Sequence, residues 1–595
     1  MQHASKFGLG GTLRITAPDV PFSSIDRLDP QKDYVFGSWE LFRCCLLRTL
    51  LSFEGAPTRN GGTILRPDLA TSLPSVSADG LTWTFHLRRG IHYAPPLQHL
   101  EVSSTDIIRA LLREANPTAS KGGYSSYYSV IAGFEDVAKG RAQSIPGLEA
   151  PDPHTLRVHL VHPEGDLGQF FALAATAPIP PNPFDPSARL GVAEGHDGGD
   201  GGLVVTTGPY MIQGADSLDF SKPPAEQEPA AGLVPGKSVV LVRNPSWKRS
   251  TDHLRPAYVD RIDVTIGGTF EQASKQLDRG ATDLVVVMSP QPPPDLALYR
   301  SSSTRGRIDV EPRDSVRYVS MNLAIPPFDD VHVRRAVNLA IDRQAALDSL
   351  GGSDEGQVAG HIAVDSLEND LLLNFDPYRT PGEHGDMSRA RAEMAQSRYD
   401  SNHDGICDAP ACEGVVALTL DSPIMVAASK AIARNLRGIG VDIRVEPKAD
   451  IFDLVGNPAK HIPMAIEIAW LKDIPSASNF ITPLFNSPQL EGPPEANGNY
   501  SLLGATPEQL ARWRYRVRSV PRVDDRIAQC QPTRGSDQFS CWATLDQYLM
   551  TDIVPWVPLV SESHLQIVPA RLAHYSYDQF TDEPALDQIA LKRSP

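Results

Sequence analysis

Residues 400–408 combine oxygen-bearing side chains and a glycine at a spacing that suits a hard cation. The candidate ligands lie at alternate positions: Asp400, Asn402, Asp404 and, through its backbone carbonyl, Ile406. With Gly405 at the sharp turn, this order reproduces the start of an EF-hand calcium loop. The twelfth position is Ala411 instead of a bidentate glutamate, although Glu413 lies close by. Two interpretations stay open: a structural Ca²⁺, or a polar Asx turn without a metal.

An aromatic side chain and a carboxylate stand close together at residues 470–473. Trp470 and Asp473 follow the apolar run 464–469, which is typical of a buried strand. This order predicts that an aromatic face and a carboxylate emerge together at a strand end. The alternative is a tryptophan packed in the core, with Asp473 starting a turn. The spacing alone favours neither interpretation.

Four of the six cysteines fall into two close local pairs, Cys407 with Cys412 and Cys530 with Cys541. Short loops closed by disulfides suit an oxidising compartment, so we predict these two bonds. The alternative is a set of reduced, partly buried thiols. The adjacent Cys44 and Cys45 lie inside the apolar run 41–51, where core packing is the better expectation. The sequence does not determine how this last pair is bonded.

Motifs of the common enzyme classes are missing or stand in the wrong context. Residues 231–238 match a relaxed phosphate-loop pattern, but they follow a Pro-rich loop and open an apolar strand instead of a helix. The sequence contains no G-x-S-x-G elbow, H-E-x-x-H pair or repeated C-x-x-C spacing. The net charge of −17, without a run of Lys and Arg, disfavours a nucleic-acid partner. We therefore name no catalytic residue and expect no enzyme.

These groups must be positioned by a mixed set of strands and helices. At 595 residues the chain is several times an ordinary domain, so it should hold more than one core. A turn at Asp79 and Gly80 predicts a hairpin strand over 81–88, and Ser103 with Asp106 predicts a helix cap. Periodicity predicts these further elements: helices over 39–51 and 331–347, and a strand–helix–strand order over 415–420, 424–439 and 441–446. The fold class is therefore α/β.

Several motifs, in the same order along the chain, resemble the extracellular solute-binding proteins of family 5, the peptide, nickel and cellobiose binders of ABC importers. They occupy these residues: 69–74 with 79–88, 207–210, 243–247, 321–336 (MNLAIPPFDDVHVRRA) and 340–343. The resemblance runs over nearly the whole chain.

The resemblance implies an α/β, two-lobed clamp of the periplasmic-binding-protein type II, with an extra subdomain inserted in the first lobe. The implied divisions are 1–52 for the first part of lobe I, 53–200 for the inserted subdomain, 201–317 for the second part of lobe I, 318–555 for lobe II and 556–595 for the return to lobe I. The strands that cross between the lobes are expected near 318–323 and 554–559.

The resemblance also suggests ligand-binding residues. In peptide-binding members a carboxylate three residues after a tryptophan meets the α-ammonium of the ligand, and the matching positions here are Asp473 and Trp470. Tyr124 matches a tyrosine that lines the cleft from the inserted subdomain. Arg48 and Lys472 depart from the family pattern, and they would either add positive charge near the ligand or pair with Asp473 internally.

The implied function is an extracytoplasmic substrate-binding protein of an ABC transporter, which captures an oligopeptide between two lobes and delivers it to the permease. We expect a monomer that needs no cofactor, apart from the open calcium question. Alternatives are the same fold binding an oligosaccharide or other small solute, and a secreted α/β hydrolase. No stretch of about 18 apolar residues occurs, and the start is neither a signal peptide nor an anchor. We therefore expect that a leader was removed from an extracellular, periplasmic or lipid-anchored cell-surface protein.

Overall fold

A computed structural model describes residues 7, 9–18, 28–33, 36–118, 124–197, 199, 201–286, 296–301, 306–492, 494 and 497–592. The chain divides into two compact units. Unit 1 comprises residues 1–311 and 564–595, and unit 2 comprises residues 312–563. The expected second lobe, 318–555, therefore lies inside unit 2, while the limits 53–200 of an inserted subdomain stay a prediction.

The main sheet of unit 1 is mixed and has the strand order β12-β1-β11-β10-β8, with β9 pairing β10. Its strands are β1 (Thr12–Ala17), β8 (Tyr210–Ile212), β9 (Leu233–Val234), β10 (Ser238–Arg243), β11 (Arg261–Ile266) and β12 (Leu284–Val285). β1 runs parallel to β11 and β12, whereas β10 is antiparallel to β11. Leu13 and Ile15, at alternate positions of β1, are almost fully buried, which explains the period-two pattern in the sequence.

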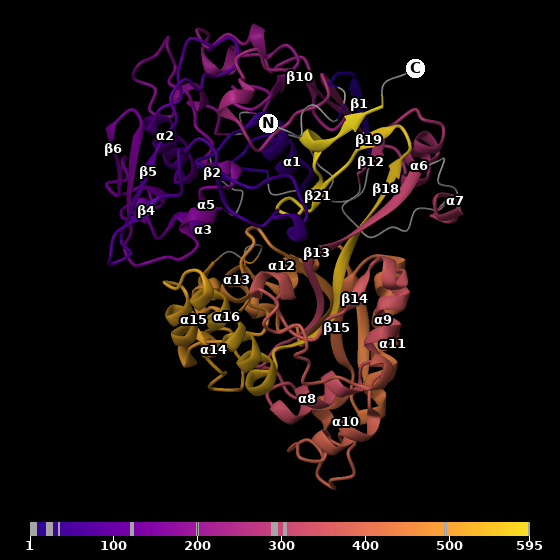
Figure 1. The fold of residues 1–595 in the computed structure, drawn as a ribbon. Helices are drawn as coiled ribbons and strands as arrows, with labels where there is room; N and C mark the ends of the chain where they lie inside the picture. The colour runs from indigo at the N-terminus through magenta and orange to yellow at the C-terminus, as the bar shows by residue number, and fades with distance from the viewer. Residues whose placement is uncertain are drawn as a thin grey trace. The chain divides into compact units, whose positions relative to one another are not determined.

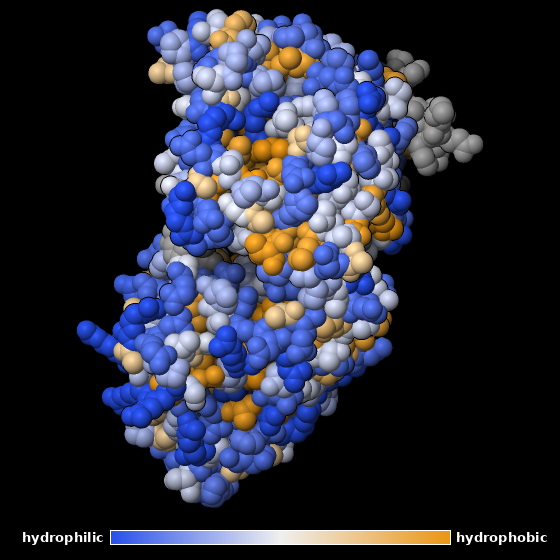
Figure 2. Space-filling view, turned by 90° about the vertical axis from the view of Figure 1, so that its left-hand side faces the viewer, coloured by the Kyte–Doolittle hydropathy of each residue, from blue (hydrophilic) through white to orange (hydrophobic). Residues whose placement is uncertain are grey.

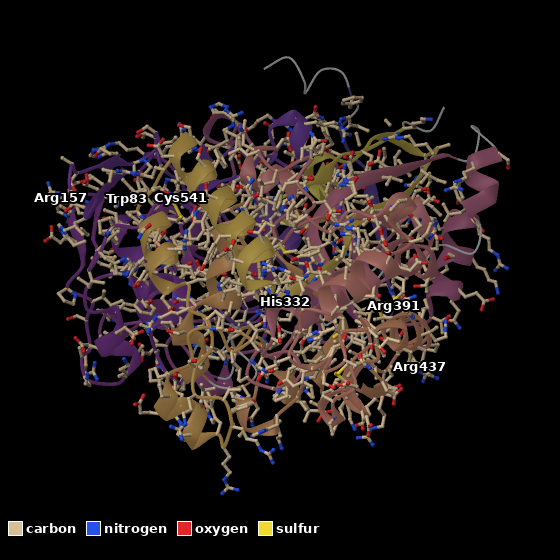
Figure 3. The ribbon with its side chains drawn as sticks, turned by 90° about the horizontal axis from the view of Figure 1, so that it is seen from below. Trp83, Arg157, His332, Arg391, Arg437 and Cys541 are labelled. Carbon is tan, nitrogen blue, oxygen red and sulfur yellow. A yellow bond between two sulfur atoms is a disulfide. The ribbon has the colours of Figure 1, made fainter. Side chains whose placement is uncertain are left out.

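A second, four-stranded sheet in unit 1 has the order β4-β5-β7-β6, with all pairs antiparallel. Its strands are β4 (Ser75–Val76), β5 (Thr82–His86), β6 (Leu148–Asp152) and β7 (Thr155–His159). Trp83 on β5 pairs with Val158, the residue next to Arg157 on β7 (Figure 3). Gly80 adopts a φ of 75° in the turn before β5, so the predicted hairpin is confirmed. The helix α2 (Ser104–Glu114) begins at the predicted capping box of Ser103 and Asp106.

The remaining elements of unit 1 are short. Its helices are α1 (Phe36–Glu40), α3 (Ser125–Tyr128), α4 (Phe134–Ala138), α5 (Leu167–Phe170), α6 (Phe270–Asp278) and α7 (Leu296–Ser301). Its small strands are β2 (Leu51–Ser52), β3 (Arg66–Pro67), β19 (Leu572–His574), β20 (Tyr577–Asp578), β21 (Glu583–Pro584) and β22 (Ala590–Leu591). The four short strands near the C-terminus belong to unit 1, so the two ends of the chain share this unit.

Unit 2 is built on one mixed sheet with the order β14-β18-β13-β17-β15-β16. Its strands are β13 (Gly306–Met321), β14 (Gly356–Val358), β15 (Val415–Leu420), β16 (Ile443–Lys448), β17 (Met464–Leu471) and β18 (Trp556–Pro569). The predicted β-α-β unit is confirmed, because β15 and β16 are parallel and α11 (Pro423–Leu436) connects them. The strands β13 and β18 carry the chain across the division between the units, at 311/312 and 563/564. The expected crossings near 318–323 and 554–559 thus fall inside unit 2.

Helices flank both sides of the unit 2 sheet. They are α8 (Val331–Ala340), α9 (Arg343–Leu350), α10 (Met387–Met394), α12 (Ile451–Val455), α13 (Ser478–Phe485), α14 (Pro507–Arg512), α15 (Asp524–Cys530) and α16 (Ser536–Tyr548). In Figure 1, α14, α15 and α16 lie to the left of the sheet, while α9 and α11 lie to its right. Both layers contribute to one apolar core, in which Ile432 of α11 and Trp542 of α16 are 1% exposed.

Two predicted helices are wrong in extent. The helix expected over 331–347 is two helices, because Ile341 adopts a ψ of 130° and Asp342 then caps the second one. The helix expected over 39–51 is α1 followed by a π-helical turn, Leu41–Leu46, which ends at Leu47. Beyond that point the backbone of Leu51 pairs with Pro67 as a strand. Strand pairing near Leu51 and the cap at Asp342 thus override an apolar periodicity that would suit longer helices.

Candidate functional site

Trp470 and Asp473 lie at the end of β17, as predicted. The indole Nε1 of Trp470 donates to the backbone oxygen of Asn479 over 2.9 Å. The amide of Asp473 donates to the side-chain Oδ1 of Asn479 over 2.6 Å. Asp473 is 4% exposed, while Trp470 is only partly buried against the core. Asn479, in the first turn of α13, therefore fixes both the ring and the backbone that carries the carboxylate.

Lys472 points into the interior of unit 2. Its ammonium is 2.9 Å from the carboxylate of Asp314 on β13, and neither side chain has any exposed area. Its amide also donates to the backbone oxygen of Asp314. The expectation that Lys472 adds positive charge beside a ligand does not fit this burial. A buried cation needs a close anion to offset its lost hydration, and β13 supplies one.

Arg48 belongs to a buried network of two cations and two anions in unit 1. Its Nε donates to Asp68 over 2.7 Å, and Arg255 is 2.9 Å from the same carboxylate. Asp252 lies 3.3 Å from Arg255, and all four side chains are at most 1% exposed. Burial raises the pKa of Asp252, but the guanidinium groups of Arg255 and Arg48 outweigh it and bring this pKa to about 2. The charge of Arg48 is thus balanced inside unit 1, which corrects its expected role as free charge near a ligand.

A second buried cluster joins the two ends of unit 1. Arg43 contacts the carboxylates of Glu40 at 2.9 Å and Asp587 at 2.5 Å, and it also pairs with Asp578. One cation therefore faces three carboxylates. Burial raises the pKa of Glu40 well above its ordinary value, in spite of the neighbouring Arg43. This cluster fastens the segment around α1 to the C-terminal strands of the same unit.

Tyr124 lines a small pocket within unit 1. The other lining residues are Trp39, Phe42, Arg43, Leu47, Thr49, Ser52, Ala172, Leu173, Ala174, Arg255 and Phe580. The Tyr124 side chain is 1% exposed, and its hydroxyl donates to the backbone oxygen of Asp33 over 2.8 Å. Its ring lies 6.2 Å from that of Trp39. This pocket brings Tyr124 together with aromatic rings and two buried arginines, and its role in ligand binding stays a prediction.

All six cysteines form disulfides. Cys407 bonds to Cys412 and Cys530 to Cys541, the latter in α16 (Figure 3), as predicted. Cys44 and Cys45 are fully buried, as expected, but they are bonded to each other instead of packing as thiols. Adjacency was the only sequence signal for this vicinal bond, and the π-helical turn places both residues in the core.

A group of buried titratable side chains lies elsewhere in unit 2. Ligand-type atoms of His361, Glu368 and Asp546 lie within 4.8 Å of one another. His361 Nδ1 is 3.0 Å from Asp546, and its Nε2 is 3.0 Å from Asp365. Burial raises the pKa of Glu368 well above its ordinary value. Burial lowers the pKa of His361, but the facing carboxylates outweigh it and bring it to about 10. Protons on His361 and Glu368 can therefore balance this cluster without a metal. Sequence reasoning missed it because Asp546 lies 185 positions after His361.

The four candidate calcium ligands, Asp400, Asn402, Asp404 and Ile406, lie in unit 2 in the loop between α10 and β15.

Comparison with known proteins decides the family. Residues 65–491 match the bacterial extracellular solute-binding proteins, family 5. The chain belongs to this family. The strand end at Trp470 and the pocket at Tyr124 are therefore features of a family 5 protein.

Similar proteins include members with different names. The chain is 24% identical to heme-binding protein A of Haemophilus influenzae over 366 residues, or 58% of this chain and 56% of that protein. It is 23% identical to the periplasmic oligopeptide-binding protein OppA of Escherichia coli over 276 residues, or 46% of this chain and 44% of that one. The matched segments thus span about half the length of these relatives.

The fold of this family 5 chain is also that of solved structures. The clavulanic acid biosynthesis oligopeptide binding protein 2 matches with a TM-score of 0.77 and 25% identity, over 98% of this chain and 96% of that chain. The two-lobed α/β fold class inferred from the sequence is therefore confirmed.

Two further features of this family 5 chain concern its helices and its surface. No helix within the described ranges is long and apolar enough to cross a bilayer. Hydrophilic residues cover most of the face drawn in Figure 2, and hydrophobic residues form separate patches on it.

Proposed function

We propose that this family 5 chain is an extracytoplasmic substrate-binding protein that captures an oligopeptide and delivers it to the membrane permease of an ABC importer. Support comes from family membership and from similar proteins that carry oligopeptide binding in their names. The proposal includes that the chain performs no catalysis and works outside the cytoplasmic membrane, either free or held by a lipid anchor.

The observation that carries this proposal is the arrangement at the end of β17. Asp473 is 4% exposed and its backbone is held by Asn479, which also binds the ring of Trp470. A carboxylate with so little water around it makes a strong, charge-assisted hydrogen bond to an ammonium group. The neighbouring Lys472 pairs with Asp314, and we assign Asp473 to the α-ammonium of the peptide.

Replacing Asp473 by asparagine tests this role. We expect Asp473→Asn to weaken binding of the cognate peptide by roughly 2–5 kcal/mol, since the ammonium would lose its buried partner. Isothermal titration calorimetry with peptides identified by native mass spectrometry of the purified protein measures the change.

The matched control is Asp525→Asn, because Asp525 is an exposed aspartate of α15 in the same unit. It should leave both affinity and unfolding temperature unchanged. Equal affinity of Asp473→Asn and the unmodified protein, with free-amine peptides, would remove Asp473 from the proposal.

The small molecule that co-purifies with the protein identifies the ligand class. A mixture of short peptides supports the proposal. An oligosaccharide, a metal chelate or a porphyrin would replace the peptide by another solute, and the similarity to a heme-binding protein makes the porphyrin a specific comparison.

A further inference from the structure

The carboxylate of Asp400 has one oxygen that the protein leaves without a hydrogen bond. Its Oδ2 accepts from the amide of Gly405 over 2.7 Å. Its Oδ1 is buried and has no hydrogen-bond partner among the described residues. Because the residue is 1% exposed, water does not readily replace a partner. An ionised oxygen in such a place is costly unless a cation contacts it.

The side-chain oxygens of Asn402 and Asp404 also accept hydrogen bonds from backbone amides of the loop. Asn402 Oδ1 accepts from the amide of Asp404 over 2.9 Å, and Asp404 Oδ1 accepts from the amide of Ile406 over 2.9 Å. Gly405 has a φ of 84°, and a Cβ on it would lie 2.5 Å from the Cβ of Arg391. The glycine is therefore required both by the turn and by the closeness of α10.

The loop is anchored before any ligand arrives. The disulfide of Cys407 with Cys412 closes its C-terminal side, and the amide of Cys407 donates to the backbone oxygen of Ile439 over 2.9 Å. Arg391, which with Arg437 is labelled in Figure 3, donates to the backbone oxygen of Gly438. A loop held in this way loses little conformational entropy when it binds an ion.

The carboxylates of the loop form no ion pair with a residue that the structure describes. Asp400, Asp404 and Asp408 take part in no ion pair with the described lysines, arginines and histidines. Asp408, at the ninth position, instead accepts from the amide and hydroxyl of Ser401. Within the described part of the chain, three carboxylates in nine residues thus lack an ion-pair partner.

We propose that residues 400–408 bind one Ca²⁺ ion. Its ligands are the side chains of Asp400, Asn402 and Asp404, the backbone oxygen of Ile406, and water held by Asp408. Oxygen-only ligands in an irregular loop favour calcium over zinc, which prefers nitrogen and sulfur, and over magnesium, which demands a near-ideal octahedron. Without a bidentate glutamate at the twelfth position, we expect a Kd of about 10⁻⁴–10⁻³ M, as in extracellular calcium modules. The ion would fasten α10 to β15, and this role does not depend on the identity of the transported solute.

The test uses the full chain after treatment with a chelator. We expect calorimetric titration with CaCl2 to show one ion per chain, and we expect saturating Ca²⁺ to raise the unfolding temperature, because it binds only the folded loop. Asp404→Asn should weaken Ca²⁺ at least about tenfold, since it removes charge from the ion. Asp404 is exposed, and an asparagine can still accept from Ile406, so this variant should keep the unfolding temperature of the calcium-free protein.

The control variant is Asp453→Asn, an exposed aspartate of α12 in the same unit. It should bind Ca²⁺ like the unmodified chain. The proposal is overturned if the protein shows no heat of binding and no thermal shift at a Ca²⁺ concentration of about ten times the expected Kd. An equal loss of binding in both variants overturns it as well. Tight Zn²⁺ binding without Ca²⁺ binding also overturns it and would point to the His361 cluster.

Discussion

His361 faces three carboxylates in the interior of unit 2, those of Asp365, Glu368 and Asp546. Its pKa in the folded protein is about 10, compared with about 6.5 in an unfolded chain. A raised histidine pKa means that its stabilising contribution is complete below about pH 6.5. The contribution then declines steadily and is lost as the pH passes about 10. The raised pKa of Glu368 acts in the same direction, because its folded form resists losing a proton.

We therefore expect the free energy of unfolding to fall between about pH 7 and pH 10. Urea unfolding at a series of pH values measures this slope. His361→Gln should be less stable at pH 7 and should show a flatter profile, because the imidazolium is gone. A profile of equal slope in the variant and the unmodified protein would mean that other groups control the pH dependence.

Residue types alone did not reveal the partners of the charged candidates. Arg48 and Lys472 stood out in the sequence as unusual cations. Their partners, Asp68 and Asp314, lie 20 and 158 positions away. Only the register of β13 against β17 brings Lys472 to Asp314.

At the scale of elements, the break between α8 and α9 depends on one side chain. Asp342 accepts a hydrogen bond from the amide of Ala345 over 2.8 Å and so caps α9. Replacing Asp342 by alanine leaves this amide without an acceptor. We expect Asp342→Ala to lower the free energy of unfolding by about 0.5–2 kcal/mol, measured by urea titration.

Asp348→Ala is the control for this cap. Asp348 is an exposed residue of the same helix, and its carboxylate accepts a hydrogen bond from the side chain of Gln344. Its replacement should cost less than the loss of the cap. If Asp348→Ala costs as much as Asp342→Ala, loss of the cap does not account for the effect.

Elements whose signals lie within a few residues were predicted well. The capping box before α2, the hairpin turn at Gly80 and the parallel unit β15-α11-β16 all appear in the structure. The extents of the helices after Trp39 and Val331 were wrong, because their ends depend on distant strands and on a single cap.

At the scale of the whole molecule, two separate cores predict separate unfolding. Unit 1 contains both chain ends, whereas unit 2 is one continuous segment, residues 312–563. Differential scanning calorimetry should therefore resolve two transitions. Asp342→Ala should lower only the transition of unit 2. A single transition that moves as a whole would show that the units unfold cooperatively.

The family, the α/β class, two local disulfides and the position of the loop at 400–408 could all be inferred from the sequence. Each of these signals is carried by residue order over short distances, where backbone geometry leaves few choices. The tertiary structure alone decided which charges are balanced: Arg48 by Asp68, Lys472 by Asp314 and His361 by Asp546. It also decided that Cys44 and Cys45 are bonded and that one oxygen of Asp400 is buried without a hydrogen-bond partner among the described residues. These outcomes depend on burial and on pairing across the sheets, which join residues that the linear order keeps apart.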